Sequence, residues 1–524
     1  MKSTRAISYL VCIAILISAF TGCEKKQASD KNSDGVTELT YFASFTPNGQ
    51  AGLTTRADTE FYKAIEKELN IKIKFTHPVS GQETEQFGLM LASKSIPDII
   101  EWDWLSSYPG GVEKAFSDKK IIALNDIIDN GKAPNLKKYL EEKPELAKMV
   151  KTDDGKYYAF PFLKDDPILS TNFGISIRQD WLTELGLSVP ETIDEWHNVL
   201  TEFKNKKGAA SPLIFSKNNI GDHSDSFIGA FGVPRKFYLE DGKVKYGSIQ
   251  PEFKKFLETF STWLSEGLID KDFAVVDRKT YDARILNNEV GAFLGFAGSH
   301  LGSYLDSAFG KGTAFDLTAA PYPVMNKGDR PQLGNYINPY MGFGSAAIST
   351  ACKNVDIAAK LLDFGYGEKG RLMFNFGIEG ESYTMVDGSP KFTDVILKNP
   401  DGLNTSQAMT KYMRAHENAP MVQLKEYIYQ YYKYDQQKKA LEVWSDTDAK
   451  NYMLPPLTPT AEESTRYASI MSDVLTYTDE MFDKFVMGVE PVSGYDSYVE
   501  QVKKFGIDEA ISILQNAYDR YKER

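Results

Sequence analysis

The residues best suited to binding chemistry form the loop Trp102-Asp103-Trp104, which follows a short apolar stretch at residues 97–101. The flat rings can lie against the C–H face of a sugar ring, and the carboxylate can accept hydrogen bonds from adjacent hydroxyl groups. Such groups form a site when they converge in a cleft with aromatic walls. We expect at least one tryptophan to face a cleft. The alternative is that one packs under the loop and the other caps a sheet.

Further candidates lie where strands or chain crossings are expected to end. Two of them have a structural alternative: Tyr158 could pack in a core, and Arg178 could form an ion pair with Asp180. The five histidines show no metal-ligand spacing, and no loop alternates Asp with Asn, so we expect no metal and no cofactor. The further candidate ligand contacts are Tyr158, Arg178, Phe296, Ser299, Tyr336, Tyr340, Glu381 and Tyr383.

The elements that would position these residues alternate between strand and helix. Residues 36–101 read as strand, helix, strand, helix, strand, which predicts a parallel sheet covered by helices. In such sheets ligands bind beyond the carboxyl ends of the strands. Residues 317–324, with two prolines, are expected to be an irregular crossover. Capping boxes at Thr192 with Glu195 and at Thr460 with Glu463 predict two helix starts.

The first residues have the pattern of an export signal. Lys2 and Arg5 precede an apolar run at residues 6–20, which is shorter than the roughly 20 residues of a membrane-spanning helix. The run ends in small residues before Cys23, which resembles the lipobox of bacterial lipoproteins. That resemblance implies removal of residues 1–22 and a diacylglyceryl anchor on Cys23, with residues 23–35 as a tether. The alternative is ordinary secretion after cleavage nearby.

Composition narrows the possible partners. The chain of 524 residues has a formal net charge of −12, which argues against nucleic acid as a partner. Of three cysteines, Cys12 lies in the signal and Cys23 is the expected anchor. Only Cys352 remains, so we expect no internal disulfide after export.

Several motifs, in their order along the chain, resemble the extracellular solute-binding protein family 1, in its branch of lipid-anchored proteins that serve carbohydrate ABC importers. The resemblance implies a type II, periplasmic-binding-protein-like α/β fold of two discontinuous lobes with a hinge and an interlobe cleft. We expect residues 36–163 with 325–400 in one lobe, and 164–324 with 401–524 in the other. The matching motifs are Ile96-Pro97-Asp98-Ile99, Gly155-Lys156-Tyr157-Tyr158-Ala159-Phe160-Pro161, Ile177-Arg178-Gln179-Asp180-Trp181-Leu182, Gly380-Glu381-Ser382-Tyr383 and Phe485-Val486-Met487-Gly488.

The function that the resemblance implies is capture of an oligosaccharide without catalysis. The protein would act as a monomer at the extracellular face of the cell membrane and deliver the sugar to the permease subunits of an ABC transporter. A peptide or another small polar solute is the alternative cargo. An exported polysaccharide-degrading enzyme would need two carboxylates facing each other across the substrate, and no sequence pattern identifies such a pair.

Overall fold

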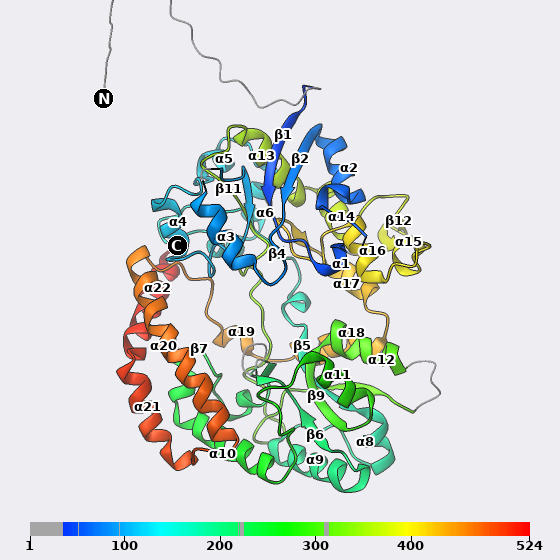
Figure 1. Ribbon diagram of the computed structural model, residues 1–524, viewed down its shortest axis with the longest axis vertical. Helices are drawn as coiled ribbons and strands as arrows, with labels where there is room; N and C mark the ends of the chain where they lie inside the picture. The colour runs from blue at the N-terminus through cyan, green and yellow to red at the C-terminus, as the bar shows by residue number, and fades with distance from the viewer. Residues whose placement is uncertain (1–34, 51, 94, 218, 221–224, 309–313) are drawn as a thin grey trace, which may run out of the picture.

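The computed structural model describes residues 35–50, 52–93, 95–217, 219–220, 225–308 and 314–524. The expected signal peptide, Cys23 and nearly all of the expected tether lie outside these residues. The described chain forms two α/β lobes, one above the other in Figure 1. Within the described ranges, no helix has the length and apolar character needed to cross a bilayer.

The first lobe is built on a mixed sheet of four strands with the order β11-β3-β1-β2. Three strands are parallel, as the alternating pattern predicts, and β11 is antiparallel. Consecutive residues at the end of β1 and the start of β3 are buried, so the sheet is covered on both faces there. The elements are β1 (Thr37–Phe42), α2 (Glu60–Leu69), β2 (Ile71–Thr76), α3 (Glu83–Ala92), β3 (Ile99–Glu101), β11 (Ala346–Ile348), α13 (Val355–Asp363) and α14 (Glu368–Phe376).

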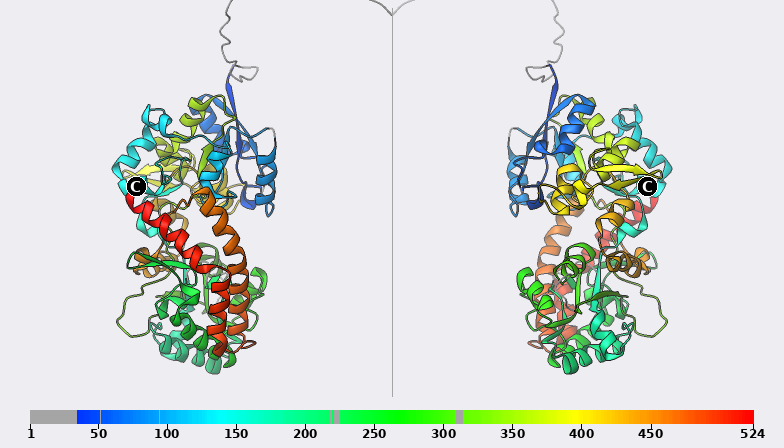
Figure 2. Two further views of the ribbon diagram at one scale, coloured as in Figure 1. Left: turned by 90° about the vertical axis from the view of Figure 1, so that its left-hand side faces the viewer. Right: turned by 90° about the vertical axis from the view of Figure 1, so that its right-hand side faces the viewer.

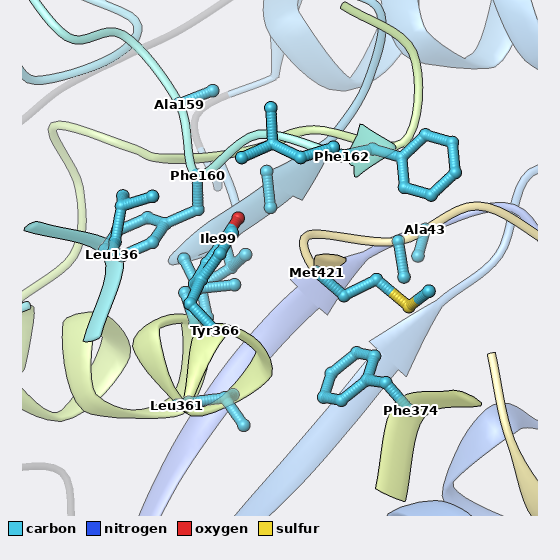
Figure 3. Close-up of a cluster of buried hydrophobic side chains, with 14 of the residues drawn as sticks. Ala43, Ile99, Leu136, Ala159, Phe160, Phe162, Leu361, Tyr366, Phe374 and Met421 are labelled. Carbon is cyan, nitrogen blue, oxygen red and sulfur yellow. The ribbon is translucent and has the colours of Figure 1, made fainter. Parts of the chain in front are cut away.

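The core of the first lobe joins two distant stretches of the chain. The first stretch is residues 39–163 and the second is residues 340–427. Figure 3 shows Ile99 and Phe160 of the first stretch together with Tyr366, Phe374 and Met421 of the second, and the rings of Phe160 and Tyr366 have centroids 6.3 Å apart. The core includes buried residues as far along the chain as Tyr427. The first lobe therefore extends past the expected boundary at residue 400, because the apolar residues of 408–427 fill this core and not the other.

The second lobe has its own four-stranded sheet, with the order β10-β5-β9-β6. Strand β10 replaces the expected irregular crossover at residues 317–324. It pairs with β5 only up to Ala320, so Pro321 and Pro323 follow the last paired residue and remove no hydrogen bond from the sheet. The elements are β5 (Phe173–Arg178), α8 (Gln179–Leu185), α9 (Ile193–Lys207), β6 (Ser211–Ile214), α10 (Pro251–Ser265), α11 (Arg278–Leu286), β9 (Val290–Phe296), β10 (Leu317–Ala320) and α18 (Asp435–Ser445).

The chain passes between the lobes beside a small parallel sheet of β4 (Leu163–Lys164) and β14 (Val422–Gln423). Lys164 also donates its backbone N–H to the carbonyl of Pro339 at 3.0 Å. Leu163 is fully buried in the first core, so the Lys164 side chain points to the other face of the strand. Burial lowers the pKa of the Lys164 amine to about 7. The crossing thus contains a lysine whose charged form is disfavoured.

Lys164→Met should stabilise the protein at neutral pH. The amine has a lower pKa in the folded state, about 7, than the unfolded value of about 10.4. Stability of the wild type should therefore rise as the pH increases from about 7 to about 10, and the methionine variant should lose that rise. Urea unfolding of the wild type and of Lys164→Met across this pH range measures the free energy of unfolding of each protein. Lys398→Met, at an exposed lysine, is the control. An unchanged pH profile in Lys164→Met would contradict the prediction.

The C-terminal helices α20 (Ala461–Val486), α21 (Tyr495–Lys504) and α22 (Ile507–Glu523) pack on the second lobe, and the ends of α20 and α22 reach the first (Figure 2). The Asp153 carboxylate of the first lobe accepts hydrogen bonds from Arg520 and Arg524. Arg524 Nε is 3.0 Å from Asp153 Oδ1. Arg520 also bonds Glu463 near the start of α20, at 2.6 Å. These ion pairs tie the two lobes together along one flank.

Candidate functional site

A cavity of about 590 Å³, which we call the aromatic cavity, lies between the lobes. Phe296 at the end of β9 contributes from the second lobe, and Phe343, which packs on the first core, contributes from the other. The short helix α19 (Ala449–Tyr452) and the segment 333–338 complete the wall. The aromatic residues that line this cavity are Phe237, Tyr238, Phe296, Tyr336, Phe343 and Tyr452.

A β-hairpin supplies two of these rings. Strands β7 (Phe237–Glu240) and β8 (Lys243–Tyr246) are joined by Asp241-Gly242, both with positive φ, of 51° and 74°. A two-residue turn of this kind matches the twist of the strands and favours Asp-Gly. The Phe237 ring also packs against Tyr246, with centroids 4.8 Å apart. The hairpin therefore holds the Phe237–Tyr238 wall rigidly.

Asn172, just before β5, lies at the wall of the aromatic cavity and contains a buried polar atom without a partner. Its backbone carbonyl accepts the Ala297 N–H at 2.9 Å, and its N–H donates to Asn335 Oδ1 at 2.9 Å. The side-chain Oδ1 is buried and has no hydrogen-bond partner among the described residues. A buried acceptor without a partner costs about 1–3 kcal/mol. The Oδ1 atom has no accessible surface, so a ligand hydroxyl in the cavity could reach it only if the side chain turned.

A second cavity of about 320 Å³, the polar cavity, adjoins the turn that follows β9. The first lobe provides Asn48 of α1 (Pro47–Gln50) and residues 404–406 at the start of α16 (Thr405–Tyr412). The second lobe provides Gly298 and residues of α12 (Ser303–Ala308), including Asp306. Because both lobes line it, a ligand that fills the polar cavity would contact both at once.

A buried ion network positions the first-lobe wall of the polar cavity. Arg56 Nη1 is 2.7 Å from Glu417 Oε2, and Arg414 Nη2 is 2.8 Å from Glu101 Oε1. Arg56 Nε donates to the carbonyl of Ser44 at 2.7 Å, which holds the chain just before α1. Burial alone would raise the pKa of Glu417, but the positive charges of Arg56, His416 and Arg414 hold it at about 2. The carboxylate is therefore charged at all ordinary pH values.

Two of the predicted contact residues, Phe296 and Tyr336, line the aromatic cavity. The Phe296 ring meets Phe173 edge to face, with centroids 4.9 Å apart. Burial raises the pKa of the Tyr336 hydroxyl. Ser299 lies in the turn Ala297–Gly302, between glycines of the polar cavity, and its Oγ is 3.3 Å from His300 Nδ1.

The Trp102-Asp103-Trp104 loop packs inside the first lobe and lines neither cavity. Trp104 is fully buried, and its Nε1–H points to the Ile100 carbonyl at 3.3 Å. Trp102 stacks on Phe87 of α3 with ring centroids 4.0 Å apart. Asp103 accepts hydrogen bonds from the backbone of its own loop, and burial raises its pKa. Trp104 thus packs in the core, as in the alternative, whereas Trp102 and Asp103 are half-buried and their contact with a ligand stays a prediction.

Tyr158 and Tyr340 also belong to the first core. Both are buried, and their hydroxyl groups bond each other at 2.7 Å. Tyr383, in the hairpin of β12 (Tyr383–Val386) and β13 (Ser389–Phe392), is buried in the same core, while Glu381 before it is exposed. None of the four lines either cavity.

Arg178 has the structural role considered as its alternative. Its Nε donates to Asp180 Oδ1 at 2.8 Å and its Nη1 to Asn288 Oδ1 at 2.6 Å. The guanidinium also lies between the rings of Trp181 and Phe315, at 4.3 and 4.5 Å. All faces of this buried group are occupied, so it has no surface for a ligand in this conformation.

Most residues of the cavity wall, including Asn172, Tyr238 and Tyr452, were not among the predicted contacts. One available signal was the Asp-Gly pair at 241–242 between alternating apolar residues, which is typical of a hairpin. No comparable signal marks Asn172 or Tyr452, since their place depends on how distant segments meet. The described residues contain no group of three or more His, Cys, Asp or Glu arranged to hold a metal ion.

Comparison with known proteins finds relatives along nearly the whole chain. Residues 51–371 match the family model described as bacterial extracellular solute-binding protein. The fructooligosaccharide ABC transporter substrate-binding protein FusA of Streptococcus pneumoniae serotype 4 (strain ATCC BAA-334 / TIGR4) is 26% identical over 486 residues, which cover 87% of this chain and 86% of FusA. Lipoprotein LipO of Bacillus subtilis (strain 168) is 24% identical over 483 residues, 88% of this chain and 89% of LipO.

Solved structures agree with these relatives in fold. The crystal structure of alginate-binding protein AlgQ2 without calcium ion superposes with a TM-score of 0.74 at 24% identity, covering 92% of this chain and 98% of AlgQ2. At this level of identity the likeness concerns the fold. It confirms the expected two-lobed solute-binding architecture.

Proposed function

This chain belongs to the bacterial extracellular solute-binding proteins, and we propose that it captures an oligosaccharide between its lobes and delivers it to the permease of an ABC transporter. Membership of this family makes it a binding protein and not an enzyme. The observation that carries the proposal is the aromatic cavity, where six aromatic residues and polar residues such as Asn338 line one space between the lobes. FusA, a relative along most of the chain, is named for fructooligosaccharides.

Binding would favour the closed arrangement of the lobes. The rings cover the C–H faces of the sugar, while the polar cavity meets its hydroxyl groups from both lobes. A ligand shifts the equilibrium only by its extra contacts in the closed state, and the residues of both walls provide such contacts. We expect a Kd near micromolar, about −8 kcal/mol.

Isothermal titration tests the proposal directly. The exported chain would be titrated with kestose, nystose, cellotetraose, xylotetraose, mannotetraose and tetragalacturonate, and with a tetrapeptide mixture as the alternative cargo. We expect at least one saccharide to bind with a Kd in the micromolar range and to reduce the radius of gyration measured by X-ray scattering. A folded protein that binds the peptides and none of the saccharides would refute the sugar proposal.

The proposed location is the outer face of the cell membrane, with the monomeric protein held by acyl chains on Cys23. The match to lipoprotein LipO supports the anchor, and each buried CH₂ of such chains contributes ~0.8 kcal/mol. Labelled palmitate should be incorporated into the wild type and not into Cys23→Ser, which should appear in the medium. Equal membrane retention of both proteins, without label, would exclude the anchor. Analytical ultracentrifugation checks the monomer.

A further inference from the structure

Charged side chains around the two cavities balance in sign. The aromatic cavity is lined by one acid, Asp225, and one base, Lys236. The polar cavity is lined by Asp306 and Lys433, with Oδ1 and Nζ 2.5 Å apart. Among the described lining residues, neither cavity has an arginine or a histidine. The formal charge of each described lining is therefore zero.

The arginines near the cavities bind other parts of the protein. Arg235 precedes Lys236 in the chain, yet it is buried in the second lobe, where it pairs with Asp479 and covers the Phe482 ring at 4.5 Å. Arg330, in the segment that leads to the cavity wall, pairs with Asp446 and Asp448, each at 3.0 Å. Each of these guanidinium groups already has a carboxylate partner.

This balance has a consequence for the ligand. An oligosaccharide of uronic acids carries one carboxylate per sugar unit, and such groups are bound by arginine forks or an excess of lysine. A carboxylate enclosed in a cleft without a compensating cation keeps its full desolvation cost. The described walls offer no surplus positive charge, and the chain as a whole is acidic, with a net charge of −12.

Hydroxyl groups, by contrast, match what the walls provide. The rings of Phe296 and Tyr452 offer apolar faces, and Asn338 adds an amide side chain to the same wall. In the polar cavity Ser303 and Thr405, one from each lobe, can donate or accept. We propose that the cleft selects neutral oligosaccharides and rejects uronic-acid oligosaccharides of the same length; this rests on the proposed function.

A matched titration tests the charge selection. Cellotetraose, nystose, xylotetraose and mannotetraose are compared with tetragalacturonate at 20 and 300 mM salt. We expect a neutral tetrasaccharide to bind at least about ten-fold more tightly than tetragalacturonate, and its Kd to be insensitive to salt because no net charge is brought together. Tetragalacturonate binding as tightly as any neutral ligand would overturn the inference while leaving sugar binding intact. If none of the saccharides bound, the result would instead refute the proposed function itself.

A charge-changing variant gives a second readout. Asp225→Asn keeps the side-chain size, and its oxygen can still accept the Arg235 N–H that Asp225 Oδ1 receives at 2.7 Å. The variant makes the described wall of the aromatic cavity net positive. We expect its affinity for tetragalacturonate at 20 mM salt to improve about five-fold, and its affinity for the neutral ligand to change less. Asp394→Asn, at an exposed acid, is the control and should match the wild type. No gain in Asp225→Asn would count against the inference.

Discussion

Replacing Glu417 by glutamine should lower the free energy of unfolding at pH 7 by about 3 kcal/mol. The carboxylate is 2% exposed and bonds Arg56 at 2.7 Å. Its pKa of about 2, against an ordinary 4.5, corresponds to roughly that free energy. The same order is expected when one partner of a buried ion pair is removed, because the other charge remains buried. Denaturant unfolding measures the loss, with Glu426→Gln, at an exposed position in the same region, as the control.

The pH dependence gives an independent check on Glu417. A carboxyl group whose pKa is lower in the folded state stabilises the protein fully above its unfolded pKa of about 4.5, and the stabilisation disappears as the pH falls toward 2. The wild type should therefore lose about 3 kcal/mol more than Glu417→Gln over this window. Parallel pH profiles of the two proteins would show that the carboxylate is not stabilised by the network.

Phe296→Ala should weaken ligand binding about thirty-fold, which corresponds to about 2 kcal/mol. Phe296 ends β9 at the wall of the aromatic cavity, held edge to face by Phe173 at 4.9 Å. Truncation removes a ring face that a sugar would cover, and it leaves the sheet pairing of the backbone unchanged. Titration with the tightest-binding saccharide measures the loss.

A matched variant separates loss of contact from loss of fold. Phe505→Ala removes a half-buried ring between α21 and α22, which meets Tyr477 at 5.4 Å and lines neither cavity. Phe505→Ala should lower the melting temperature about as much as Phe296→Ala does, and it should leave the Kd for the saccharide unchanged. Tyr452→Ala, at another ring that lines the aromatic cavity, should repeat the affinity loss. Unchanged binding in both cavity variants would place the ligand elsewhere.

Local patterns predicted much of the fold. The alternation in residues 36–101 corresponds to β1, α2, β2, α3 and β3. Capping boxes at Thr192 with Glu195 and at Thr460 with Glu463 are confirmed at the starts of α9 and α20. These features depend on neighbours in the chain, which a sequence shows directly.

The lobe boundaries and β10 were harder to predict because they depend on distant partners. Residues 408–427 are apolar enough for either core, and only their packing against Phe374 and the first sheet assigns them. Strand β10 is short and followed by proline, so its local sequence favours a loop. These residues form a strand because they pair with β5.

The site was predicted least well. The sequence placed the loop Trp102-Asp103-Trp104 correctly at the end of β3, but it could not show which way the rings turn. Phe87 of α3 provides a stacking partner 4.0 Å away, which draws Trp102 toward the lobe. Phe296 and Tyr336 were candidates because they border a strand end and a crossing, and both line the aromatic cavity. Asn172 and Tyr452 both belong to the second lobe, but 280 positions separate them in the chain, so only the folded lobe brings them to one cavity.

The attachment of Arg520 and Arg524 to Asp153 has a consequence for how the cleft is entered. As long as these bonds hold, the flank carrying α20 and α22 should stay joined, and we expect a glycan to arrive from the opposite edge. Amide exchange should then be equally slow in the Thr152–Gly155 turn with and without sugar, while amides around the cavities become slower to exchange when it binds.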